Sequence, residues 1–152
     1  GGEIRPEALR VMVNKMMPVF DIVLLDTAAG LGAPFLAAKA VASMALVVIT
    51  PDAVTMRDGR IVADELFDAG MPEIRLIINR VAVGRGAKNP VSNLDECIDT
   101  VGAQLIGVVP ASQEIAFAAA EGRVLGAASD EKLIMRSIAF RILGEDAPLV
   151  IR

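Results

Sequence analysis

The chain has 152 residues with 15 basic and 19 acidic side chains, no histidine and one cysteine. Its net charge of −4 argues against a nucleic-acid surface, and the absence of histidine excludes Ser-His-Asp and Cys-His catalysis and the usual zinc sites. The single cysteine, Cys97, cannot form an internal disulfide and fits a reducing compartment; on its amphipathic segment it is better explained by packing than by reactivity. The length is that of one domain, residues 1–152.

The first third of the chain predicts two helices and two buried strands. An apolar stripe at 3.6-residue spacing predicts a helix over 7–17, and the aliphatic run DIVLLD predicts a strand over 21–26. An alanine-rich helix over 34–44 then leads into a strand over 45–50. The window 31–50 is long enough to cross a bilayer, but Lys39 lies inside it and alanine inserts weakly. A buried helix followed by a buried strand explains this window better, so no membrane helix is expected.

The remaining two thirds continue the alternation. The segment 56–69 predicts an amphipathic helix whose apolar side faces the core, and Gly70 and Pro72 end it. Strands are predicted over 74–79 and 105–109, and helices over 94–101, 113–121 and 130–143. Alternating strands and helices predict an α/β fold, with a parallel sheet of about four strands and helices on both faces.

Polar or sharply turned residues follow every predicted strand. In open parallel sheets, ligands bind outside the carboxyl ends of the strands, so four such endings together predict a shared ligand crevice. The endings are Asp26-Thr27, Thr50-Pro51, Asn79-Arg80 and Pro110-Ala111-Ser112.

Each ending has a functional and a structural interpretation. Asp26 could hold Mg²⁺ through water beside a nucleotide phosphate, or cap a turn. The amide of Asn79 could pair with a purine edge, or form a turn, and Arg80 could stack on a base or remain solvated. Pro110 and Ser112 could line a base pocket, or make an ordinary strand-to-helix cap.

Five segments in this order resemble the bacterial MinD/ParA family of P-loop ATPases. They are FDIVLLDTAAGLG, ITPDAVTMRDGRIV, LIINRV, LIGVVPAS and SIAFRILGEDAPL, and the resemblance runs from about Phe20 to Leu149. It implies ATP and Mg²⁺ as cofactors. It implies that Asp26 is the catalytic, Walker B-like residue near Mg²⁺, holding it through water, and that Thr27 begins the switch II loop at the nucleotide.

The same resemblance implies that Asn79 and Arg80 contact adenine and that Pro110 and Ser112 belong to the loop around the base. The helix with Arg57, Asp58, Arg60 and Asp64 then lies where family members meet partners and each other, although a solvated helix face explains these charges most simply. It further implies a homodimer in the bacterial cytoplasm, with peripheral membrane association expected from the family only.

Two departures from the family pattern stand out. No G-x-x-x-x-G-K-[ST] loop is present, so the pattern starts about halfway and we expect a carboxyl-terminal portion of such an ATPase. Ala28 stands where the family usually has proline. The strand that carries the missing loop normally separates 21–26 from 45–50. We therefore expect the chain to pair these two strands directly, to borrow a strand from another copy or to aggregate through the open edge.

The leading hypothesis for function is an ATP-dependent dimer switch that places the division site or another cargo. Without the phosphate-binding loop, we expect the chain alone not to hydrolyse ATP. A non-catalytic scaffold or interaction module that kept the fold without the nucleotide site is the alternative. A third possibility is an unrelated flavodoxin-like domain, for which TAAGLG is a poor phosphate loop.

Overall fold

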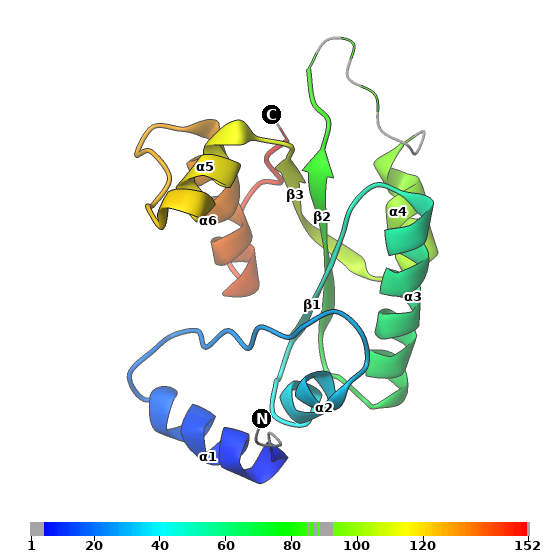
Figure 1. The fold of residues 1–152 in the computed structure, drawn as a ribbon, viewed down its shortest axis with the longest axis vertical. Coiled ribbons are helices and arrows are strands. Elements are labelled where there is room, and N and C mark those ends of the chain that lie inside the picture. Colours follow the sequence, from blue (N-terminus) through cyan, green and yellow to red (C-terminus); the bar gives the residue numbers. More distant parts are fainter. Residues whose placement is uncertain (1–4, 85, 87, 89–92, 152) are drawn as a thin grey trace.

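The centre of the molecule is a parallel sheet. A computed structural model describes residues 5–84, 86, 88 and 93–151. Its sheet has three strands in the order β1 (Ala45–Ile49), β2 (Ile74–Val81) and β3 (Gln104–Pro110), and both pairings are parallel. Figure 1 shows these strands running side by side with helices around them. The α/β fold with a parallel sheet is therefore confirmed.

Six helices accompany the strands in the described part of the chain, close to the predicted positions. They are α1 (Pro6–Met16), α2 (Ala33–Lys39), α3 (Ala53–Asp68), α4 (Leu94–Val101), α5 (Gln113–Glu121) and α6 (Asp130–Ile142). The alanine-rich helix is shorter than predicted, because it ends at Lys39 and a turn leads into β1. Of the helices described, none is long and apolar enough to cross a bilayer.

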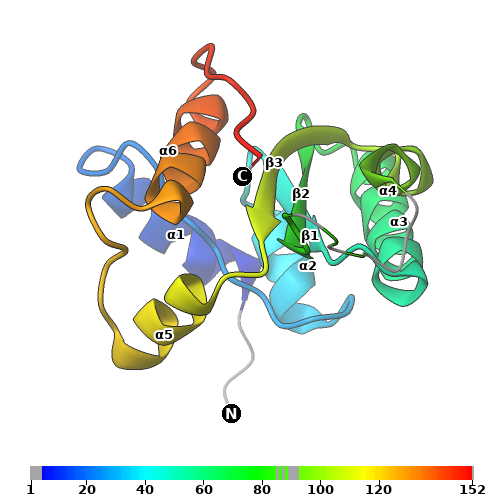
Figure 2. The same cartoon turned by 90° about the horizontal axis from the view of Figure 1, so that it is seen from above.

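Helices cover both faces of the sheet. Figure 2 shows α3 and α4 on one side and α5 and α6 on the other. Alternate strand residues point to the two sides, so Leu76 and Ile78 of β2 join the core beneath α3 and α4. Ile77 packs instead with Ile134 and Ile138 of α6. Because helices cover both faces, both sets of alternating strand residues are apolar, and the strands therefore consist of unbroken aliphatic runs.

Two glycines let helices approach the sheet closely. A Cβ at Gly59 of α3 would lie 2.6 Å from Ile49 Cγ2, and a Cβ at Gly107 of β3 would lie 2.4 Å from Ile138 Cγ1. Neither gap admits a methyl group. Gly59 is therefore needed within the RDGR sequence for packing of the helix on β1, and Gly107 for packing of α6 on β3.

The prediction of a strand over 21–26 is wrong. These residues are in no helix or strand, and Leu24 is 74% exposed. A strand forms only where a neighbour accepts its backbone hydrogen bonds, and no described strand pairs with this segment. The sheet therefore has three strands rather than about four, and β1 lies at its edge with Val48 57% exposed. The direct pairing considered above does not occur.

The amino-terminal part is attached through α2. Arg10 of α1 donates to the Ala40 carbonyl at 2.5 Å, and Lys39 forms an ion pair with Glu65 of α3 at 2.6 Å. No residue of α1 is buried. In α2, by contrast, Ala37 and Ala38 are buried and Phe35 packs against the core. We infer that α2 is anchored in the core and that α1 is attached mainly through α2.

The close approaches at Gly59 and Gly107 predict a stability cost for added methyl groups. We expect Gly59→Ala and Gly107→Ala each to lower the free energy of unfolding by about 1–3 kcal/mol, because the added Cβ must displace Ile49 or Ile138. Urea unfolding followed by circular dichroism measures this cost. Gly126→Ala is the matched control, because its Cβ would lie 4.0 Å from the nearest side chain. Equal stability of all three variants would contradict the packing assigned to these glycines.

The cap of α3 predicts a dependence of stability on pH. The Asp52 carboxylate accepts from the N–H groups of Val54 and Thr55 at 3.1 and 3.0 Å. Hydrogen bonds from the Thr50 hydroxyl, and then from the Thr55 backbone, lower its pKa below the ordinary 3.8. A lowered folded-state pKa stabilises the fold above the ordinary value, and that stabilisation is lost as pH falls through the folded-state value.

We therefore expect Asp52→Asn to be less stable than the parent at pH 7 and to approach it in stability near pH 3. Urea midpoints for both proteins at the two pH values test this expectation. A gap between the two proteins that is as large at pH 3 as at pH 7 would show that the carboxylate charge is not what stabilises the cap.

Candidate functional site

The carboxyl ends of β2 and β3 meet at a β-bulge. Ile78 pairs with Val108 and Val81 with Pro110, so β2 has two residues, Asn79 and Arg80, where β3 has one. Ala111 donates its N–H to the Val81 carbonyl at 2.9 Å, which continues the contact beyond the strands. The bulge therefore brings three of the predicted site residues, Asn79, Arg80 and Pro110, to one edge of the sheet. We call this place the carboxyl-end rim.

Arg80 has an unusual backbone conformation at this bulge. Its φ of +56° lies in the left-handed region, and it is the one non-glycine residue described with a positive φ. The Asn79 Oδ1 accepts from the Arg80 N–H at 2.9 Å. A left-handed arginine costs free energy, and such residues concentrate at functional sites. Arg80 is exposed and Pro110 is buried, so the rim combines an exposed basic side chain with a buried apolar one.

The end of β1 is closed by a polar network that the sequence reasoning missed. The Thr50 hydroxyl donates to the Asp52 carboxylate, and the Thr55 hydroxyl donates to the Thr50 carbonyl at 2.7 Å and lies 3.0 Å from Asp52 Oδ2. The helix therefore starts at Ala53, earlier than the predicted residue 56. The T-P-D-x-x-T spacing was the available signal, because an aspartate followed three residues later by a second polar side chain is typical of a helix start.

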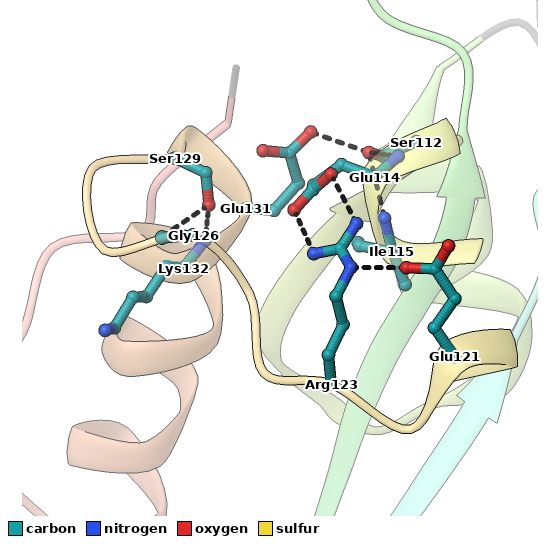
Figure 3. Close-up of polar contacts among 9 residues, drawn as sticks. All are labelled: Ser112, Glu114, Ile115, Glu121, Arg123, Gly126, Ser129, Glu131 and Lys132. Atoms are coloured by element: carbon teal, nitrogen blue, oxygen red, sulfur yellow. Dashed lines mark hydrogen bonds and ion pairs between the residues drawn. The ribbon is translucent and has the colours of Figure 1, made fainter. Parts of the chain in front are cut away.

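Ser112 begins the helix after β3. Its Oγ accepts from the N–H groups of Glu114 and Ile115 at 3.1 and 3.4 Å, and its hydroxyl donates to Glu131 of α6 at 2.6 Å (Figure 3). The structural interpretation of Ser112 as a helix cap is therefore confirmed. A contact between Ser112 and a base remains a prediction.

An arginine fixes the segment after α5. Arg123 donates through both Nη atoms to Glu114 at 2.9 and 3.1 Å and through Nε to Glu121 at 2.7 Å (Figure 3). Hydrogen bonding to Arg123 lowers the pKa of the Glu114 carboxyl, and the carboxylates raise the pKa of Arg123. No periodic pattern in the sequence predicted this cluster. It joins the start of α5, beside the rim, to the loop that leads to α6.

Asp26 and Thr27 are not brought to the rim. Asp26 is exposed and Thr27 is half-buried on the extended segment before α2. Figure 1 shows the connection between α1 and α2 near the amino ends of the strands, away from the arrowheads that mark the rim. No group of three or more His, Cys, Asp or Glu residues in the described ranges could hold a metal ion. A role of Asp26 in holding Mg²⁺ through water remains a prediction.

The helix proposed for partner contacts exposes its charges. Arg57 and Asp58 have side chains 74% and 64% exposed, and Arg60 and Asp64 form an ion pair at 2.8 Å while half exposed. The solvated helix face is thus confirmed. Cys97 is buried and its pKa is raised chiefly by burial, which supports packing rather than reactivity.

Comparison with known proteins finds MinD proteins similar to this chain. No family model matches the chain. It is 30% identical over 97% of its length to the septum site-determining protein MinD of Synechocystis sp., and 30% identical over 96% to MinD of Bacillus subtilis. A chain of the MinC:MinD cell division protein complex of Aquifex aeolicus matches the fold with a TM-score of 0.84 and 25% identity, covering 97% of this chain and 63% of that chain.

A further solved structure agrees on the fold. MinD of Pyrococcus horikoshii, solved in complex with Mg-ADP, matches with a TM-score of 0.75 and 21% identity over 91% of this chain and 56% of that chain. The chain spans about half the length of the curated relatives it matches, 56% for both named above. Both the sequence matches and the structure matches nevertheless cover nearly all of this chain. Over nearly its whole length the chain is therefore similar to septum site-determining MinD proteins.

Proposed function

We propose that this chain is the base-binding and partner-binding portion of a MinD-like, ATP-dependent dimer switch that acts in division-site placement. The observation that carries the proposal is the bulge at the end of β2, which sets Asn79 and Arg80 beside Pro110. The Asn79 amide nitrogen is the donor for an acceptor nitrogen of adenine, since its oxygen already accepts from Arg80. In our proposal the exposed Arg80 guanidinium stacks on the base.

The phosphates and Mg²⁺ need groups that the described residues do not assemble. A triphosphate requires backbone N–H groups and a lysine at close range. At the rim, the first N–H groups of α3 and α5 already bond to Asp52 and Ser112. Support for nucleotide use comes from the relative solved with Mg-ADP. In our proposal Asp26 holds the metal through water, and Thr27 reaches the nucleotide, only when further chain completes the sheet beside β1.

The exposed face of α3 is the proposed contact surface for a protein partner or a second copy. It carries Arg57, Asp58, Arg60 and Asp64 without burying them. The relative solved as a MinC:MinD complex supports protein partners in general. We propose a homodimer in the bacterial cytoplasm, with membrane association only at the surface.

The position of Asp26 favours a second candidate function for the chain by itself. Its segment lies away from the rim, so the metal-binding and base-binding parts are not joined (Figure 1). A non-catalytic interaction module would have this property. Measurement of ATP hydrolysis distinguishes the two functions.

We expect the 152-residue chain to release no phosphate from Mg-ATP. A chimera that joins it to the amino-terminal half of the Bacillus subtilis relative should hydrolyse ATP, because that half supplies the phosphate loop of the family pattern. Phosphate release measures both proteins. Asp26→Ala in the chimera should reduce turnover at least about a hundredfold, as expected for removing a group that stabilises charge at the transferred phosphate.

Two controls interpret that result. Asp21→Ala removes a carboxylate from the same segment and should leave turnover within about twofold. A folded chimera without turnover would favour the interaction module, whereas turnover by the isolated chain that is lost on Asp26→Ala would contradict our account of what the site requires.

The conformation of Arg80 predicts that stability and binding can be separated. Arg80→Gly should be about 1 kcal/mol more stable than Arg80→Ala, because glycine adopts a positive φ without strain. Both variants lose the guanidinium and should weaken nucleotide binding by the chimera to the same extent, about tenfold. Urea unfolding and calorimetry measure the two effects. Equal stability of the variants, or unchanged affinity, would remove the role assigned to Arg80.

A further inference from the structure

Glu131 reaches from α6 to the start of α5. It is half-buried in the first turn of α6, and its Oε1 accepts from the Ser112 hydroxyl at 2.6 Å (Figure 3). Ser112 lies two residues after Pro110, so the Cα atoms of these two residues are no more than about 7 Å apart. Between them, the Ala111 N–H donates to the Val81 carbonyl at 2.9 Å. Glu131 is therefore joined through one side chain to the loop that follows the carboxyl-end rim.

The hydroxyl of Ser112 has no hydrogen-bonding capacity left for a ligand. A hydroxyl has one donor hydrogen and two acceptor lone pairs. The hydrogen is donated to Glu131, and the Oγ accepts from the N–H groups of Glu114 and Ile115 at 3.1 and 3.4 Å. If Ser112 belongs to the loop around a base, its side chain therefore offers that base no free donor or acceptor.

Glu131 has the capacity that Ser112 lacks. A carboxylate can accept about four hydrogen bonds through its two oxygens and donates none. Of the residues drawn in Figure 3, Ser112 alone contacts Glu131, and it does so through Oε1, so Oε2 has no contact among these residues. The side chain at this loop that can still bind a ligand is therefore a hydrogen-bond acceptor.

A second contact fixes the first turn of α5. Glu114, two residues after Ser112, accepts from both Nη atoms of Arg123 at 2.9 and 3.1 Å. Two parallel hydrogen bonds of this kind fix the relative geometry of the two groups. The start of α5 is thus held by Glu131 from α6 and by Arg123 from the segment after α5. Groups held in this way are positioned before a ligand arrives, which discrimination between similar ligands requires.

The two purine bases differ at the edge that such an acceptor meets. Adenine presents the acceptor N7 beside its donor 6-amino group, whereas guanine presents two acceptors, N7 and O6. In the proposed function the Asn79 amide nitrogen donates to an acceptor nitrogen of adenine, and the neighbouring amino group still needs an acceptor. A carboxylate satisfies that amino group and repels the O6 oxygen of guanine. A site built to hydrogen-bond one group strongly rejects an analogue that lacks it.

We propose that Glu131 is the specificity-determining residue of the base site, where it accepts from the 6-amino group of the base and selects adenine over guanine. This inference rests on the proposed function, since it needs a base at the carboxyl-end rim beside Asn79 and Arg80. It assigns the selection to α6, outside the strand endings from which the site was predicted. Ser112 then has a positioning role, because its hydroxyl holds the Glu131 carboxylate at the loop.

Binding of ADP and of GDP to the 152-residue chain tests this assignment. The amide signals of Arg80 and Ala111 give both dissociation constants, and the readout is the adenine preference, the constant for GDP divided by that for ADP. In Glu131→Gln the amide oxygen can still accept from Ser112, and its NH₂ group then meets the ligand as a donor. We expect Glu131→Gln to lower the adenine preference at least about tenfold and Glu131→Ala to lower it less. A merely structural role predicts the opposite order, with Glu131→Gln close to the parent and Glu131→Ala changed most.

Glu121→Gln is the matched control. It removes one negative charge from the same part of the molecule, where Glu121 is exposed and contacts Arg123, so it should leave the adenine preference within about twofold. If the parent binds neither nucleotide at the rim, the base site of the proposed function and this inference both fail. If the parent binds ADP there without preferring it to GDP, or if Glu131→Gln keeps the preference, the base site stands and the role assigned to Glu131 is wrong.

Discussion

The parallel pairing of β2 with β3 is the contact on which the rest of the structure depends. It places Leu76 and Ile78 beneath α3 and α4, and it presents Ile77 to α6. Gly107 allows α6 to lie close against β3. Near the carboxyl end β2 has one residue more than β3, and this bulge turns Asn79 and Arg80 to the rim. The core and the candidate site are therefore consequences of one strand pair.

Among the described strands, β1 lies at an open edge of the sheet. A sheet edge leaves backbone groups without partners, and proteins usually protect such edges with charges, proline or a covering element. β1 contains neither charge nor proline, and Val48 is largely exposed. The nearby segment 21–26 has the composition of a strand and finds no strand to pair with.

Sequence patterns predicted the elements whose neighbours lie within this chain. The strands over 45–50, 74–79 and 105–109 formed at nearly those positions, because each pairs with another of the three. DIVLLD is just as aliphatic, yet it is no strand, because pairing is a property of two segments and periodicity describes one. Asn79, Arg80 and Pro110 were predicted to gather because parallel strands end at one edge. Asp26 was expected at the same edge only because residues 21–26 were predicted to form a strand. Since these residues form no strand, parallel pairing does not bring Asp26 to that edge.

The polar clusters were beyond the reach of a single sequence. Arg123 joins Glu114 and Glu121 across a helix and a turn, and Glu131 meets Ser112 from another helix. The Ser112–Glu131 contact depends on how α5 and α6 lie relative to each other, and the Arg123 contacts depend on how the chain turns back after α5, which no periodic pattern encodes. The cap by Asp52 is different, since T-P-D-x-x-T is a local signal. The bulge itself could not be predicted, because the left-handed conformation is adopted by an arginine rather than by glycine.

The most direct test of the account is an amide chemical-shift titration of the 152-residue chain with adenine nucleotide. The account predicts that ADP at millimolar concentration moves the amide signals of Arg80 and Ala111, at the rim, and leaves those of Asp26 and Thr27 unmoved. Guanine nucleotide at the same concentration should move the rim signals less. Shifts that are absent at the rim, or that gather on the segment of Asp26 instead, would contradict the claim that the bulge of β2 forms the base site.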